Sequence, residues 1–262
     1  MARLKDNLWI WGQPAGSHHK VANNCWNLPG ENKMGPLEGA QYLGIPNICI
    51  VTSGDDPAPP FDNLAETLKE CPNVAWSIIG DASSTRYSNG QTDLEEVLKI
   101  ARKYSNITGA IMDDFLRPER KEVFTPELVG EYAEKLHDAG LELWTVIYEH
   151  ELIEEVKPYL DKCDVISFWT WEGQNLKDLE KNFSELKKLV NPGKKILMGC
   201  YLWDYGNSKP LSIENMQYQL ETYKKWFDSG EIAGVVVCSN CIADLGIEAA
   251  DYAKQWFEEQ DI

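Results

Sequence analysis

Residues 107–148 read ITGAIMDDFLRPERKEVFTPELVGEYAEKLHDAGLELWTVIY and contain a complete strand–helix–strand pattern. Its first apolar run, Ile107–Met112, predicts a strand that is buried on both faces. Thr125 predicts the N-cap of a helix with proline at its first position, and the helix is expected to end at Gly140. A second apolar run, Leu141–Tyr148, follows at once. Two buried strands joined by a helix are typical of a parallel sheet.

The same alternation of apolar run and amphipathic stretch occupies the whole chain. The runs that predict strands are Leu8 to Trp11, Ile45 to Thr52, Val74 to Ile79, Ile107 to Met112, Leu141 to Tyr148, Val165 to Trp171, Lys195 to Leu202 and Ile232 to Cys238. Further helices are expected at Pro36 to Tyr42, from a capping box at Thr92 and Glu95 to about Ser105, at Leu176 to Val190, at Ser212 to Asp228 and at Gly246 to Gln260. Eight such units without a linker predict one α/β domain, a single (β/α)8 TIM barrel over residues 1–262.

An open, doubly wound sheet is the alternative architecture. The sequence contains neither G-x-G-x-x-G nor G-x-x-x-x-G-K-[ST], the phosphate-binding turns that such sheets often carry. The barrel therefore remains the better prediction. In it, residues 13–33 form a long loop after the first strand, and this loop is expected to fold over the barrel mouth.

Composition and charge exclude several classes of protein. The 262 residues are 43% hydrophobic and carry a formal net charge of −17, which disfavours binding to nucleic acid or to an anionic membrane. No apolar run is long enough to predict membrane insertion. The seven cysteines show no regular spacing, which slightly favours a reducing, cytoplasmic compartment. The first residues show no signal sequence, although removal of one would leave the same pattern, and the oligomeric state is open.

Carboxylates and aromatic side chains recur at the predicted strand ends, where barrel enzymes carry their chemistry. A sugar presents an apolar face to tryptophan or tyrosine and hydroxyls to polar groups, so this combination predicts a carbohydrate ligand. The expected substrate-binding residues are Trp11, His18, His19, Tyr148, Glu149, Trp171, Tyr201, Trp203, Tyr205 and Asn240.

The acidic pair Asp113-Asp114 ends the fourth predicted strand, in the sequence GAIMDDF. Adjacent side chains on a strand point to opposite sides, so one carboxylate can face the barrel axis. This strand resembles, in part, the motif of chitinase-type (family 18) glycoside hydrolases. Aligned on Gly109, Asp113 takes the place of the last aspartate of that motif, and Phe115 takes the place of its proton-donating glutamate. The wider likeness is to (β/α)8-barrel glycoside hydrolases in general.

Glycoside cleavage requires a second carboxyl group. Glu172 after the sixth strand is the preferred partner for Asp113 or Asp114, because some barrel glycosidases place their two acids after strands four and six. Asp204 after the seventh strand is the other candidate, as a third acid or a substrate ligand. Glu149 is weaker, because the residues after it are typical of a helix start.

Three functions follow, of which a glycoside hydrolase using paired carboxylates and no cofactor is the first. A barrel that binds carbohydrate without cleaving it is the second, because Phe115 lacks the acid. The third is a metal-dependent isomerase or hydrolase built on Glu149, His150, Asp204 and His18. No metal is predicted, since the adjacent pair His18-His19 lacks the H-x-H spacing of barrel metal sites.

Overall fold

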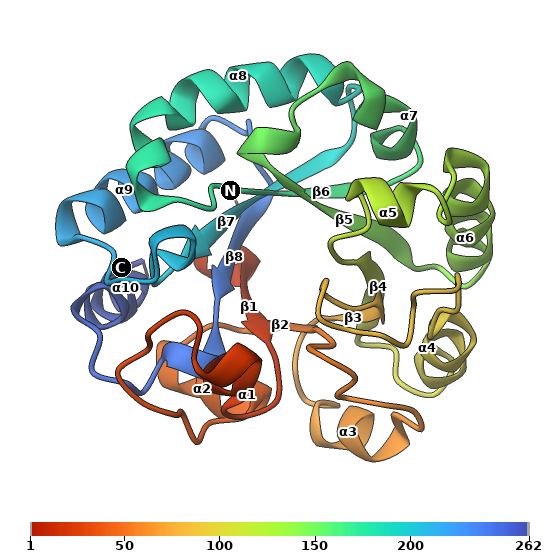
Figure 1. Cartoon of the computed structure of the whole chain (residues 1–262), viewed down its shortest axis with the longest axis horizontal. Coiled ribbons are helices and arrows are strands. Elements are labelled where there is room, and N and C mark those ends of the chain that lie inside the picture. Colours follow the sequence, from red (N-terminus) through yellow and green to blue (C-terminus); the bar gives the residue numbers. More distant parts are fainter. Residues whose placement is uncertain (1, 261–262) are drawn as a thin grey trace. The chain divides into compact units, whose positions relative to one another are not determined.

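The computed structural model describes residues 2–260 and contains eight strands that follow one another around a closed barrel in chain order (Figure 1). The pairs β1–β8, β3–β4, β4–β5 and β7–β8 are parallel. The predicted (β/α)8 barrel is therefore confirmed. The strands are β1 Leu8–Gly12, β2 Asn47–Ile50, β3 Val74–Ile79, β4 Ile107–Met112, β5 Glu142–Tyr148, β6 Val165–Trp169, β7 Lys195–Tyr201 and β8 Gly234–Cys238.

Helices connect these strands. The α-helices are α1 Ser17–Lys20, α2 Pro36–Leu43, α3 Asp62–Thr67, α4 Leu94–Ala101, α5 Pro118–Lys121, α6 Pro126–Asp138, α7 Lys157–Leu160, α8 Leu179–Leu189, α9 Ile213–Asp228 and α10 Glu248–Glu259. Short 3₁₀ helices are η1 Lys5–Asn7, η2 Val21–Asn23, η3 Glu149–Glu151, η4 Glu154–Val156, η5 Gly173–Asp178, η6 Tyr205–Asn207 and η7 Asn240–Ile242. Within residues 2–260, no helix is long and apolar enough to cross a membrane.

The chain divides into two compact units, each made of separate stretches of sequence. Unit 1 comprises Met1–Ile48, Phe168–Lys181 and Ile196–Ile262. Here α2 packs on β1, α9 packs on β8, and α10 packs on α9. Every residue of β1 and β8 is buried, as covering helices require.

Unit 2 comprises Cys49–Ser167 and Asn182–Lys195. In this unit α4 packs on β3 and β4, and α6 packs on β5 (Figure 1). The helix α6 begins as predicted, with the Thr125 hydroxyl accepting a hydrogen bond from the Leu128 amide at 3.4 Å. Gly140 follows with φ of +74°, a conformation that glycine adopts without strain. The prediction of one domain over residues 1–262 stays a prediction.

Several predicted boundaries differ from the structure. Helix α4 has Asp93 rather than Thr92 as its N-cap, so the capping box predicted from Thr92 and Glu95 does not form. The Asp93 carboxylate accepts hydrogen bonds from Arg86 and Tyr87 and makes no cap hydrogen bond to the helix. The strand predicted from Ile45 to Thr52 is limited to β2. The loop after β1 contains α1 and η2, short helices that its polar sequence did not indicate.

Candidate functional site

Three carboxylates follow two neighbouring strands of unit 2. Asp81 lies just beyond β3, and Asp113 and Asp114 lie just beyond β4. Hydrogen bonds along the sheet continue past the strand ends, since the Asp113 amide donates to the Ile79 carbonyl at 3.0 Å. The three acids are thus held by backbone pairing at the carboxyl ends of adjacent parallel strands, where barrels carry their active sites.

Asp114 is the half-buried member of the adjacent pair, and its backbone is left-handed, with φ of +49°. Aspartate tolerates this conformation better than most residues with a side chain. One carboxylate oxygen of Asp114 accepts a hydrogen bond from the Tyr148 hydroxyl at 3.0 Å. The other accepts one from the Ala82 amide, also at 3.0 Å. Two donors therefore fix the orientation of this carboxylate.

Asp113 is buried, with 3% of its surface exposed. Burial raises the pKa of the Asp113 carboxyl well above its ordinary value, and the negative charges of Asp114 and Asp81 raise it further. The Arg120 guanidinium acts in the opposite direction and lowers this pKa. Asp113 is therefore held toward its protonated form behind the more exposed Asp114.

Asp81 is half-buried and belongs to the same cluster, since its charge acts on Asp113. Burial raises the pKa of its carboxyl, and the nearby Asp114 charge adds to the effect. The hydroxyl of Ser83 donates to Asp81 Oδ1 at 2.5 Å and the Ser83 amide donates at 2.9 Å, which partly offsets the rise. Asp81 thus combines partial exposure with a raised pKa, the properties of a general acid.

Tyr148 ends β5, and its ring stacks on the ring of His150, with centroids 5.4 Å apart. Glu151, in η3, accepts a hydrogen bond from the Tyr148 amide at 3.0 Å. Burial raises the pKa of the Glu151 carboxyl, and the Asp114 charge contributes. Glu149 is also in η3, with a side chain that is 9% exposed and lies 3.9 Å from the His150 ring nitrogen.

The predicted aromatic residues of unit 1 form a second cluster. Trp171 stacks on Tyr205 with centroids 6.0 Å apart, and Tyr201 contacts both rings edge to face. Trp203 is buried, and its indole nitrogen donates to the Trp26 carbonyl at 3.0 Å. Trp11 is buried on β1, with its edge against Trp169. Trp171 and Tyr201 are half-buried.

His18 is buried on α1 and is hydrogen-bonded through both ring nitrogens. Nδ1 lies 2.8 Å from the Tyr205 hydroxyl, and Nε2 contacts Gln13 Oε1. Burial lowers the pKa of His18 from 6.5 to about 3, so the ring is neutral at physiological pH. His19, the next residue on α1, is half-buried.

Glu172 and Asp204 occupy the loops after β6 and β7. The buried Asp204 carboxylate accepts hydrogen bonds from the Gly173 amide at 3.0 Å and from the Asn207 amide at 3.2 Å, and it caps η6. These bonds tie the two loops together. Glu172 is half-buried and accepts a hydrogen bond from the Gln174 amide group at 2.8 Å. A side chain at Gly206 would come within 2.5 Å of Glu172 Cγ, so this close packing needs glycine.

Asn240 is fully buried and links the long loop after β1 to the end of β8. Its side-chain amide donates to the carbonyls of Gln13 and Met34 at 2.8 Å, and its oxygen accepts from the Gln13 amide at 2.8 Å. Every polar atom of this side chain is thereby used within the protein. The loop is anchored over β8 by these bonds, while its histidines lie on α1.

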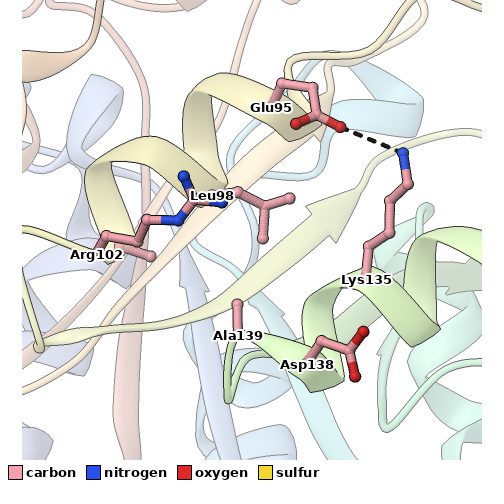
Figure 2. A pocket seen from close by; sticks show the side chains of 7 residues that line it. Glu95, Leu98, Arg102, Lys135, Asp138 and Ala139 are labelled. Atoms are coloured by element: carbon pink, nitrogen blue, oxygen red, sulfur yellow. Dashed lines mark hydrogen bonds and ion pairs between the residues drawn. The ribbon is translucent and has the colours of Figure 1, made fainter.

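A groove of about 450 Å³ lies between α4 and α6 of unit 2 (Figure 2). Leu98 and Ala139 line it, and Glu95 pairs with Lys135 at 3.2 Å across it. Its walls are helices rather than strand ends, so it is separate from the carboxylate cluster. Among the residues that the structure describes, no group of three or more His, Cys, Asp or Glu side chains is arranged to hold a metal ion.

Sequence reasoning did not select Asp81, Glu151 or Arg120. Asp81 had a recognisable signal, since it stands two residues past the end of β3, much as Asp113 stands one residue past the end of β4. The residues after Glu149 predict a helix start, and Glu151 does cap η3. Arg120 carries no local signal, because its contacts depend on the folded loops.

No protein-family model matches this sequence, and no curated protein matches it. Solved structures resemble it at low identity. The spore cortex-lytic enzyme SleL of Bacillus megaterium QM B1551 has a TM-score of 0.61 and 13% identity, covering 99% of this chain and 75% of SleL. A chitinase of Chromobacterium violaceum ATCC 12472 has a TM-score of 0.55 and 11% identity, covering 98% of this chain and 99% of the chitinase.

A mutant tryptophan synthase α-subunit of Pyrococcus furiosus is similar to the same degree. Its TM-score is 0.57 with 15% identity, and the match covers 99% of each chain. The fold is shared. Because barrels of this kind carry unrelated chemistries, the likeness leaves the reaction to be argued from the site.

Proposed function

We propose that this chain is a glycoside hydrolase that acts through the carboxylates after β3 and β4. The observation that carries the proposal is the contrast between Asp114, which accepts two hydrogen bonds, and Asp81, whose pKa is raised beside it. A carboxyl with a raised pKa beside a second carboxylate that hydrogen bonds hold in place is an arrangement that suits a two-acid mechanism.

Each carboxyl then has a defined role. Asp114, oriented by Tyr148 and the Ala82 amide, serves as the nucleophile or as the base that activates water. Asp81, partly exposed and held toward its neutral form, donates a proton to the departing glycosidic oxygen. Asp113 is too deeply buried to reach a sugar, and it supports Asp114 from behind as an uncharged neighbour.

The nature of the comparison proteins supports a glycan as the substrate class. One of them is a chitinase and another is a spore cortex-lytic enzyme. The half-buried rings of Trp171 and Tyr201 in unit 1 suit the apolar face of a sugar. Glu172, the partner that the sequence favours for Asp113 or Asp114, remains the alternative second acid.

Binding of a carbohydrate without cleavage is the second candidate function. Phe115, which stands where the chitinase-type motif has its proton donor, is fully buried, with its ring centroid 5.8 Å from that of Tyr159. That position is therefore part of the core and supplies no acid. A protein of this kind would bind glycans with Asp114 and Asp81 as hydrogen-bond acceptors.

One experiment separates these functions. The purified chain is assayed on aryl glycosides and chito-oligosaccharides with and without a chelator, and binding is measured on a glycan array. Hydrolysis that persists with chelator and is lost in Asp81→Asn supports the proposed mechanism. Binding without hydrolysis selects the second candidate. Hydrolysis abolished by chelator contradicts both and indicates a metal-dependent enzyme.

A further inference from the structure

Arg120 connects the ends of the two strands that carry the proposed catalytic acids. Its guanidinium donates to the carbonyls of Gly80 at 2.6 Å, Asp81 at 2.7 Å and Asp113 at 2.9 Å. Gly80 and Asp81 follow β3, while Asp113 follows β4. One half-buried side chain therefore joins the backbone at both strand ends.

The local backbone explains why an arginine suits this position. As each strand ends, its carbonyls lose their partners in the sheet and require new donors. Arginine presents several N–H groups in a rigid plane, so one side chain can satisfy three carbonyls at once. Arg120 reaches them from α5, which begins four residues after Asp114.

We propose that Arg120 is a positioning residue that fixes Asp81 relative to Asp113 and Asp114. This inference rests on the proposed function for its consequence in catalysis, whereas the geometric claim concerns the strand ends alone. The side chains of Asp81 and Asp113 extend from backbone atoms that Arg120 holds. Displacement of the backbone carbonyl of Asp81 or Asp113 would move the side-chain carboxyl of the same residue.

The charge of Arg120 acts on the same cluster. The charged or titratable groups that act on Asp113 are Asp81, Asp114, Arg120 and the Cys49 thiol. Arg120 is the cation in this set, and it lowers the pKa of Asp113 while the two carboxylates raise it. The guanidinium thus reduces the repulsion between acids that it also brings together.

Two substitutions separate the connecting role from the charge. Arg120→Gln removes the charge and most donors, while Arg120→Lys keeps the charge and loses the planar set of donors. Arg117→Gln is the matched control, since Arg117 is an exposed arginine three residues away that pairs with Glu119 at 3.2 Å.

The carboxyl carbons of the aspartates are followed by ¹³C NMR as a function of pH, which needs no activity. In Arg120→Gln we expect the pKa of Asp113 to rise and the Asp81 and Asp113 signals to shift. In Arg120→Lys we expect the Asp113 pKa to stay near that of the parent while the signals still shift. Signals and pKa values in both variants that equal those of Arg117→Gln would overturn the proposal.

Kinetics add a second readout if the parent hydrolyses a glycoside. Misplaced reacting groups cost up to about 10²-fold in rate, so kcat should fall by that order in Arg120→Gln with KM changed much less. Unchanged kcat in both Arg120 variants would overturn the positioning role. A parent without activity refutes the proposed function, and the NMR titration still decides whether Arg120 sets the carboxyl geometry. If Arg120→Gln does not fold, the ¹³C signals of Asp81 and Asp113 in Arg120→Lys decide whether Arg120 positions these two carboxyls.

Discussion

The phenol oxygen of Tyr148 lies 3.0 Å from Oδ1 of Asp114, so a residue at the end of β5 orients a carboxylate that follows β4. The register of β4 and β5 explains why the side chains of Tyr148 and Asp114 meet. Met112 pairs with Thr145 across the two parallel strands, and both chains then continue past the last paired residues. The left-handed backbone at Asp114 turns its side chain while Tyr148 extends from its strand.

Tyr148→Phe tests whether this hydrogen bond supports catalysis. A hydrogen bond to a charged group contributes about 1.5–3 kcal/mol, so kcat/KM should fall about 10- to 100-fold. Tyr104→Phe is the control, because the Tyr104 hydroxyl also bonds a carboxylate, that of Glu66 at 2.8 Å, on the helical side of unit 2. Equal kinetics in both variants would show that Asp114 does not depend on Tyr148.

Asp113→Asn tests the burial of a carboxyl through stability. The pKa of Asp113 in the folded chain is raised above the ordinary value of 3.8. In the pH window between these two pKa values, the folded chain keeps a proton on Asp113 that the unfolded chain has released. The free energy of unfolding therefore falls as pH rises through the window. Asparagine does not titrate, so the variant should melt a few degrees higher than the parent at pH 7, since about 1 kcal/mol moves Tm by 2–4 °C at this size. The difference in Tm between Asp113→Asn and the parent should vanish near pH 3. A Tm below that of the parent at pH 7 would contradict a raised pKa for Asp113.

The contribution of His18 to the free energy of unfolding depends on pH in the opposite direction. Its pKa falls from 6.5 when unfolded to about 3 when folded, so the unfolded chain binds more protons between these values. The contribution of the neutral ring to stability is complete above pH 6.5 and is lost as the pH falls toward 3. His18→Gln should therefore lose less stability than the parent between pH 7 and 4, measured by denaturant unfolding. A ring that titrates near pH 6.5 in ¹⁵N NMR spectra would disprove the assignment.

The barrel could be predicted from the sequence because its strands and its longer helices have local signals, whereas short helices such as α1 and η2 have none. Apolar runs mark the strands, and Thr125 and Gly140 mark the two ends of α6. The strand ends were also recognisable, so Asp113 and Asp114 could be placed at the carboxyl edge of the sheet. Side-chain alternation indicated that the two acids differ in environment, without indicating which one is buried.

The rest of the site depends on contacts between distant residues. Arg120 reaches the carbonyl of Gly80 across 40 positions of sequence, and no local pattern encodes that bond. Asp204 is predicted as a third acid or a substrate ligand, and its carboxylate accepts hydrogen bonds from the amides of Gly173 and Asn207, which residue type alone does not indicate. Partners such as these are fixed by how the loops fold, so residue type and strand position could not identify them.

Glu172→Gln decides between the two choices of second acid. If Asp81 and Asp114 suffice, this substitution should reduce kcat less than about tenfold, because Glu172 then takes no part in proton transfer. Trp171→Ala is measured beside it and should weaken glycan binding without changing kcat at saturation. A loss in Glu172→Gln of about 10²- to 10⁴-fold, typical of a proton-transfer residue, would favour Glu172 as the partner.

Hydrolysis of a glycoside by Asp114→Asn, compared with the parent chain, measures whether Asp114 supplies the nucleophile or base. Asparagine tolerates the left-handed backbone at position 114 and can still accept a hydrogen bond from Tyr148, so the fold should be retained. Asp138→Asn, at an exposed position at the end of α6, is the control. We expect kcat to fall about 10²- to 10⁴-fold in Asp114→Asn, with unchanged Tm, and we expect full activity in the control. Near-parental turnover in Asp114→Asn would show that Asp114 takes no part in the reaction.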